Sequence, residues 1–125
     1  MVTPAHDPTA VPVLTRQQLQ SKLASGQPFK LLMAVSDFGF RVKHIPGSIR
    51  VTTEPSTFSW LPKDADIVVY CSDVDCRFSR RVLERLQESG FVHLSHYAGG
   101  LTDWEAAGLP LEGDWVPGAG DAPPS

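Results

Sequence analysis

The stretch IVVYCSDVDCRFSRRVLERLQESG, residues 67–90, decides the fold of this chain. It begins with the apolar and mostly β-branched run IVVY, which is typical of a strand buried in a parallel sheet. A short polar segment follows, and from about Ser79 the apolar residues Val82, Leu83 and Leu86 recur at helical spacing. Gly90 is a residue type that commonly ends helices. The stretch therefore predicts a strand, a tight loop and a helix.

Cys71 stands at the carboxyl end of this predicted strand, where α/β sheets bind their ligands. Backbone N–H groups and the dipole of the following helix favour an anion and a thiolate at such a place. Cys71 is therefore the candidate nucleophile. The alternative is a buried structural cysteine, because free cysteine is among the most buried residue types.

Length and composition limit the class of protein. A chain of 125 residues with 42% apolar and 20% charged residues is expected to form one globular domain. The net charge of -3 gives no general attraction to nucleic acid or membrane, and no apolar run approaches the roughly 18 residues that span a bilayer. Residues 1–12 lack the pattern of a secretory signal, and two closely spaced cysteines do not make a disulfide framework. We expect a cytoplasmic protein.

The rest of the chain alternates predicted strands and helices. A flexible arm is expected over residues 1–12, one domain over 13–112 and a flexible tail over 113–125. Thr15 and Gln18 have the spacing of a capping box for a helix over 14–26, and Thr102 and Glu105 have it for a helix over 101–107. Strands are predicted over 29–35, 49–51 and 91–97, with a helical turn in 37–43. This alternation favours an α/β fold with a mainly parallel sheet.

Several residues outside the central stretch have structural interpretations. Phe58 and Trp60 are expected to cover the core, and His44 to bond a nearby backbone carbonyl. His93 and His96 are interpreted as residues of a strand surface. A second set is expected to serve the turn and helix near the carboxyl end, through positive φ, close backbone approach or core packing: Gly99, Gly100 and Trp104.

Three blocks of sequence resemble a rhodanese-like (sulfurtransferase) domain. They are HIPGS at 44–48, IVVYC at 67–71 and SGFVHLSHYAGGLTDWEAAGLPL at 89–111, in the family's order and approximate spacing. The similarity covers roughly Leu14 to Glu112. It implies a rhodanese-like α/β fold, with a central, mainly parallel five-stranded sheet flanked by helices, and transfer of sulfane sulfur through a persulfide on Cys71.

The sequence departs from the family pattern at two places. Met33 and Val35 stand where the family commonly has Asp-x-Arg, and Cys76 stands where an Arg usually is, so that Arg77 comes one position later. The longer interval resembles the dual-specificity phosphatases and arsenate reductases. The string CSDVDCRFS also resembles single-domain rhodaneses that have a second loop cysteine and a serine three residues after it, here Cys76 and Ser79. We favour this branch because the AGGLTDWEAAGLP block is typical of sulfurtransferases.

The expected substrate site is the loop after Cys71, whose backbone N–H groups would surround a negative persulfide. Its residues are Ser72, Asp73, Val74, Asp75, Cys76 and Arg77. Arg77 is either a solvated helix-start residue or a contact for an oxyanion such as a thiosulfonate. Asp73 and Asp75 would raise the pKa of the thiol and repel a dianion, which counts against phosphate or arsenate as substrate.

Cys76 has three interpretations. It is a packing residue of the loop, a resolving thiol that attacks the Cys71 persulfide or forms a reversible disulfide, or a metal ligand. The metal interpretation is the weakest, because no other Cys or His pair has ligand spacing. We therefore expect neither a metal nor a cofactor.

The sequence thus predicts a sulfurtransferase that moves sulfane sulfur through a Cys71 persulfide to a thiophilic acceptor. The alternatives are a catalytically inactive rhodanese-like binding or sulfur-relay module, and a phosphatase or arsenate reductase on the same fold. The expected partners are a small-molecule sulfur donor and a thiol acceptor, either small or on a protein, with no nucleic acid and no membrane. The sequence leaves the oligomeric state open.

Overall fold

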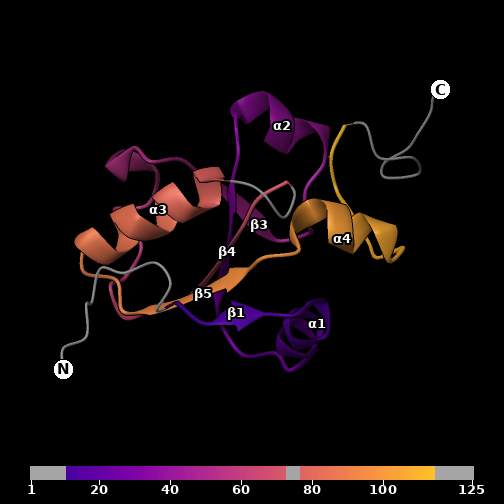
Figure 1. Cartoon of the computed structure of the whole chain (residues 1–125), viewed down its shortest axis with the longest axis horizontal. Coiled ribbons are helices and arrows are strands. Elements are labelled where there is room, and N and C mark those ends of the chain that lie inside the picture. The colour runs from indigo at the N-terminus through magenta and orange to yellow at the C-terminus, as the bar shows by residue number, and fades with distance from the viewer. Residues whose placement is uncertain (1–10, 73–76, 115–125) are drawn as a thin grey trace.

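The computed structural model of the chain describes residues 11–72 and 77–114. Strands and helices alternate along it, as the sequence predicts (Figure 1). The elements are β1 (Val13–Leu14), α1 (Arg16–Ala24), β2 (Lys30–Ala34), α2 (Asp37–Val42), β3 (Ser48–Val51), the 3₁₀ helix η2 (Pro55–Thr57), β4 (Asp66–Tyr70), α3 (Arg77–Glu88), β5 (His93–Tyr97) and α4 (Gly100–Ala106).

The strands form one five-stranded sheet in the order β1-β5-β4-β2-β3, and every pair is parallel. This confirms the predicted sheet. β4 lies in the middle, between β5 and β2. The chain moves outward on one side from β2 to β3, and on the other side from β4 to β5. The two-residue strand β1 was not predicted, because Leu14 was assigned to the first helix.

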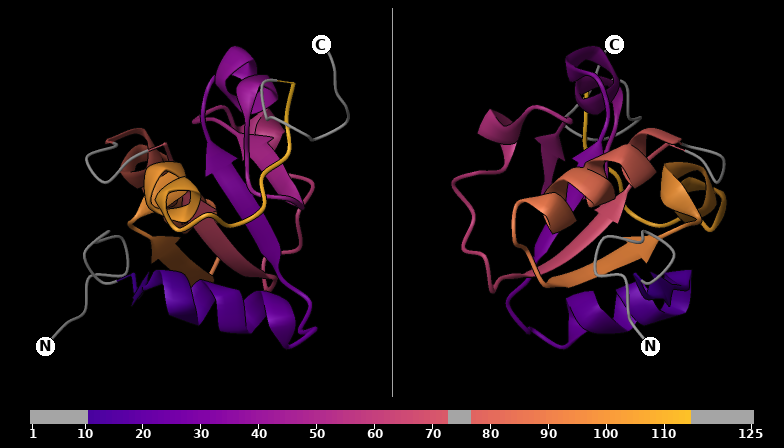
Figure 2. Two further views of the ribbon diagram at one scale, coloured as in Figure 1. Left: turned by 90° about the vertical axis from the view of Figure 1, so that its right-hand side faces the viewer. Right: turned by 60° about the vertical axis from the view of Figure 1, so that its left-hand side comes forward.

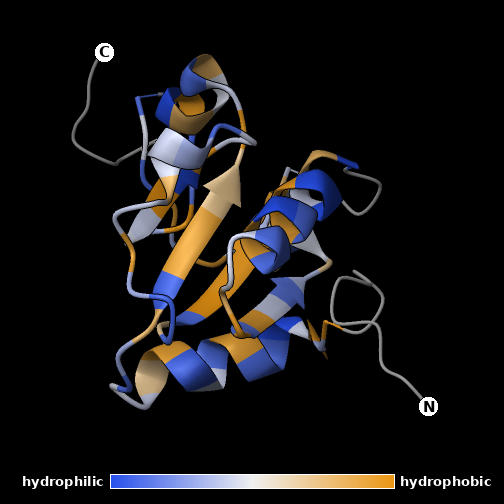
Figure 3. Ribbon diagram, turned by 90° about the vertical axis from the view of Figure 1, so that its left-hand side faces the viewer, coloured by the Kyte–Doolittle hydropathy of each residue, from blue (hydrophilic) through white to orange (hydrophobic). Residues whose placement is uncertain are grey.

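Helices cover both faces of the sheet (Figures 1 and 2). Alternate residues of β4 point to opposite faces, as in any strand. Ile67 and Val69 belong to the core cluster that contains Val82, Leu83 and Leu86 of α3. A second cluster on the other face joins β4 to α1 and α4 through Val68, Tyr70, Leu19 and Trp104. Figure 3 shows that the central strands are mainly hydrophobic, whereas the helices around them carry both hydrophilic and hydrophobic residues.

The two predicted capping boxes have different outcomes. At α1 the prediction is correct: the Thr15 hydroxyl accepts from the Gln18 amide, and the Gln18 side chain accepts from the Thr15 amide. At α4 it is wrong, because the helix begins after Gly99 and no side chain caps it. Thr102 lies inside α4 and makes a different contact, which belongs to the candidate site.

The glycine turn before α4 is needed for both of the reasons that the sequence suggested. Gly100 has a φ of 70°, which favours glycine. Gly99 has an ordinary φ, but a Cβ there would lie 2.9 Å from the Cβ of Asp103. Trp104 is buried as predicted, and its indole N–H donates to the Pro110 carbonyl at 2.8 Å.

The connection between β3 and β4 covers the core with one of the two expected aromatic residues. Phe58 is 1% exposed and packs edge-on against Phe91. The prediction for Trp60 is wrong: its side chain is 56% exposed, and its indole N–H donates to the Thr57 carbonyl. At the start of the described chain, Val11 is buried in the α3-side core.

Candidate active site around Cys71

Cys71 directly follows β4, at the carboxyl edge of the sheet. In open α/β sheets, ligands bind beyond this edge at the point where the strand order reverses. Here that point lies between β4 and β2. Cys71 is 5% exposed, and its sulfur is in a disulfide bond in the structure. The cysteine chosen from sequence therefore lies where α/β sheets bind ligands, and its role as a nucleophile stays a prediction that requires Cys71 to be reduced and uncovered.

The first turn of α4 holds the backbone at Cys71 and Ser72. The Leu101 amide donates to the Cys71 carbonyl at 2.8 Å, and the Thr102 amide donates to the Ser72 carbonyl at 2.8 Å. The Thr102 hydroxyl donates to the same Ser72 carbonyl at 2.7 Å. These bonds turn the first two carbonyls of the loop toward α4. Thr102 is a site residue that the sequence interpretation missed, because its spacing to Glu105 suggested a cap instead.

At the other end of the loop, Arg77 begins α3 and its side chain is exposed. This exposure is compatible with both interpretations of Arg77. The remaining predicted loop residues, Asp73, Val74, Asp75 and Cys76, lie outside the described residues. Their predicted roles stay predictions.

The first turn of α3 contacts β5 through a polar pair. Ser79 is 1% exposed, and its hydroxyl lies 3.1 Å from Nε2 of His96. The prediction of His96 as a strand-surface residue is wrong: its side chain is partly buried beneath α3. Burial, and then the positive charge of Arg80, lower the pKa of His96 below its ordinary value of 6.5. The imidazole is therefore neutral at neutral pH.

The end of β2 has no charged side chain at the two positions where the family commonly has Asp and Arg. Met33 is 1% exposed and Val35 is 9% exposed, and both belong to the core on the α1 and α4 side. Arg50 of β3 instead donates through Nε to the Val35 carbonyl at 3.0 Å. The structure thus gives Met33 and Val35 a packing role.

The HIPGS turn is tied to β4 next to the candidate nucleophile. His44 stacks on Phe40 at 3.9 Å, and its Nδ1 lies 2.7 Å from the Phe40 carbonyl, so the predicted structural role is confirmed. The Tyr70 hydroxyl accepts from the Ile45 amide at 3.0 Å and lies 2.6 Å from the Ser48 hydroxyl. Burial raises the pKa of Tyr70 to about 12, against the weaker opposing effect of these hydrogen bonds.

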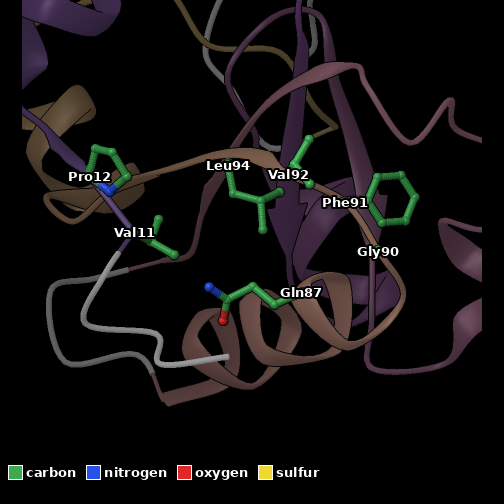
Figure 4. A pocket seen from close by; sticks show the side chains of 7 residues that line it. All are labelled: Val11, Pro12, Gln87, Gly90, Phe91, Val92 and Leu94. Carbon is green, nitrogen blue, oxygen red and sulfur yellow. The ribbon is translucent and has the colours of Figure 1, made fainter. Parts of the chain in front are cut away.

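A pocket of about 260 Å³ lies elsewhere, between the end of α3, the start of β5 and the segment before β1 (Figure 4). Apolar residues make up most of its lining, among them Val11, Phe91 and Leu94. Cys71 and the residues that hold its loop do not line it. The pocket is therefore separate from the described residues around Cys71.

Metal sites and membrane-spanning helices are both absent from residues 11–72 and 77–114. Within these ranges, no group of three or more His, Cys, Asp or Glu side chains is arranged to hold a metal ion. None of the helices there combines the length and apolar character needed to cross a membrane.

Comparison with known proteins identifies the family. The model of the rhodanese-like domain matches residues 15–107. The crystal structure of the Alr3790 protein from Anabaena sp. is 34% identical, with a TM-score of 0.70 and coverage of 80% of both chains. The solution structure of the rhodanese-like domain of Alr3790 is 31% identical, with a TM-score of 0.72 and coverage of 83% of this chain and 80% of that one. The chain therefore belongs to the rhodanese-like domain family.

More distant structures share the fold. A thiosulfate sulfurtransferase from Pseudomonas aeruginosa is 20% identical, with a TM-score of 0.66; the match covers 84% of this chain and 21% of that one. At this identity the similarity shows the fold alone. The comparison with curated proteins finds no match.

Proposed function

We propose that this chain is a sulfurtransferase that carries sulfane sulfur as a persulfide on Cys71. The observation that carries the proposal is the position of Cys71, directly after the central strand β4 and before a loop that leads into α3. Membership of the rhodanese-like family supports it, and one structural neighbour is a thiosulfate sulfurtransferase. The proposed partners are a small-molecule sulfur donor and a thiol acceptor.

The proposed reaction has two transfer steps. The Cys71 thiolate attacks the outer sulfur of a donor such as thiosulfate; an S–S bond forms on Cys71 while the donor's S–S bond breaks and sulfite leaves with the electron pair. The thiolate of an acceptor then attacks the outer sulfur of the persulfide, and the Cys71 thiolate leaves. Because Cys71 is disulfide-bonded in the structure, a two-electron reduction by an external thiol or phosphine must precede the first step.

The test is the intact mass of the protein after sulfur loading. The protein is reduced, freed of reductant by desalting, and then incubated with thiosulfate or with a polysulfide. We expect one added sulfur atom, and none in Cys71→Ser, whose fold is checked by circular dichroism. Sulfur gained by Cys71→Ser would place the persulfide elsewhere, and no loading from either donor would favour the inactive binding or relay module.

Phosphate chemistry on the same fold is the competing enzyme class. Asp73 and Asp75 of the loop sequence would repel a dianionic thiosulfate as well as a dianionic phosphate, so they do not separate the two classes. The resemblance of the AGGLTDWEAAGLP block to sulfurtransferases favours sulfur transfer. Turnover of an aryl phosphate that is lost in Cys71→Ser would replace the sulfurtransferase proposal with a phosphatase.

A further inference from the structure

One segment of the chain, residues 96–102, contacts the loop on both of its sides. The amides of Leu101 and Thr102 bind the carbonyls of Cys71 and Ser72 at the start of the loop. His96 contacts Ser79 in the first turn of α3, just after the loop ends. The end of β5 and the start of α4 thus contact the described residues on both sides of the loop.

The contact between Ser79 and His96 lies on the same face of the sheet as the Cys71 side chain. His96 pairs in register with Val69, whose side chain packs in the core on the α3 side. Strand alternation places Cys71, two residues after Val69, on that face as well. The hydrogen bond therefore holds the first turn of α3 against the sheet beside the candidate nucleophile.

The amino-terminal turn of a helix affects a nearby thiol only at short range. Its free backbone amides and the helix dipole favour a thiolate, and this effect falls off within the first turn. A small outward movement of the first turn of α3 would thus weaken the stabilisation of a Cys71 anion. His96 acts on the turn through its hydrogen bond and not through a charge of its own, because burial and then the positive charge of Arg80 lower the pKa of its ring.

We propose that Ser79 and His96 are positioning residues for Cys71, and that their hydrogen bond holds the amino-terminal turn of α3 where it stabilises the Cys71 thiolate and persulfide. The inference rests on the proposed function, since positioning the first turn of α3 matters only if Cys71 reacts as a sulfur anion. Neither residue needs to touch the substrate.

The test measures how the rate of Cys71 alkylation depends on pH. All variants carry Cys76→Ser, so that Cys71 is the single cysteine of the chain and cannot form an internal disulfide. Iodoacetamide reacts with the thiolate, so the rate profile reports the pKa of the Cys71 thiol. Ser79→Ala and His96→Leu should raise that pKa relative to the Cys76→Ser protein and slow alkylation at pH 7 roughly three- to tenfold.

Two matched variants separate positioning from a general effect on structure. His96→Gln retains a side-chain amide that can reach Ser79, and should restore much of the unaltered profile. Ser95→Ala removes a hydroxyl from the neighbouring position of β5, which pairs with Val68 and therefore faces the opposite core. Its alkylation profile should be unchanged.

The outcomes are decisive because alkylation needs no sulfur donor. A folded Ser79→Ala variant with an unaltered profile would overturn the positioning role, and so would loss of the fold in that variant, which would assign the contact to folding alone. A raised thiol pKa in a protein that never loads sulfur would instead refute the sulfurtransferase and leave the positioning role intact.

Discussion

Removal of the Tyr70 hydroxyl should destabilise the fold by about 2 kcal/mol. Three hydrogen bonds form a closed network around this hydroxyl: the Ile45 amide donates to Tyr70 at 3.0 Å, Tyr70 contacts Ser48 at 2.6 Å, and the Ser48 hydroxyl donates to the Ile45 carbonyl at 2.6 Å. Since Tyr70 accepts from Ile45 and Ser48 donates to Ile45, Tyr70 must donate to Ser48. Its pKa of about 12 keeps this proton in place at any ordinary pH.

Tyr70→Phe fills the same space but leaves the Ile45 amide, on a fully buried residue, without its acceptor. An unsatisfied buried group costs about 1–3 kcal/mol. At roughly 4 °C per kcal/mol for a domain of this size, Tm should fall by about 8 °C. Urea unfolding at pH 7 should give a lower midpoint with an unchanged m value.

Ser48→Ala is the matched comparison for Tyr70→Phe. It removes two of the same three bonds, yet Tyr70 still accepts from the Ile45 amide, and the Ile45 carbonyl still accepts from the Ser48 amide at 3.0 Å. Tyr70 loses its acceptor, but Ser48 is only partly buried, so water can take the place of the removed hydroxyl. Its cost should be about 1 kcal/mol, and the double variant should cost less than the sum of the two. A loss below about 0.5 kcal/mol in Tyr70→Phe, or a larger loss in Ser48→Ala, would refute the reasoning.

Four further predictions concern the site. Thr102→Val should cost no more than about 1 kcal/mol in urea unfolding, because the Ser72 carbonyl keeps the Thr102 amide as a donor; a larger loss would mean that the hydroxyl holds more than this carbonyl. His96 has a folded pKa below 6.5, so its contribution to stability is complete above pH 6.5 and is lost as pH falls through the folded pKa; the stability of the unaltered protein should decline over this window relative to His96→Gln, and parallel pH curves would contradict it. Cys76→Ser should load sulfur on Cys71 and hold it at least as long as the unaltered protein, measured as persulfide mass against time; failure to load would place Cys76 in the primary chemistry. Hydrolysis of aryl phosphates should be negligible, and turnover that depends on Cys71 would overturn this.

Most of the fold could be predicted from the sequence because its signals are local. The apolar β-branched run before Cys71, the helical spacing after Ser79 and the capping box at Thr15 are each contained in a few neighbouring residues. β1 escaped prediction because two residues carry no detectable strand periodicity, and they become a strand only by pairing with His96 and Tyr97 of β5. The prediction for Trp60 failed for a related reason. Its large aromatic side chain favours burial, but the segment between β3 and β4 has no hydrophobic periodicity that shows which of its residues face the core.

The position of the candidate nucleophile was also a local inference, whereas the residues that hold it were not. Thr102 lies 30 positions from Ser72, and His96 lies 17 positions from Ser79, so no spacing rule connects either pair. Both contacts exist because β5 lies beside β4 in the sheet and leads directly into α4. β5 is thus able to supply supporting residues for the loop that follows its neighbour β4. His96 is one of them on our proposal, because it pairs with Val69 of β4 on the face that strand alternation assigns to the candidate nucleophile.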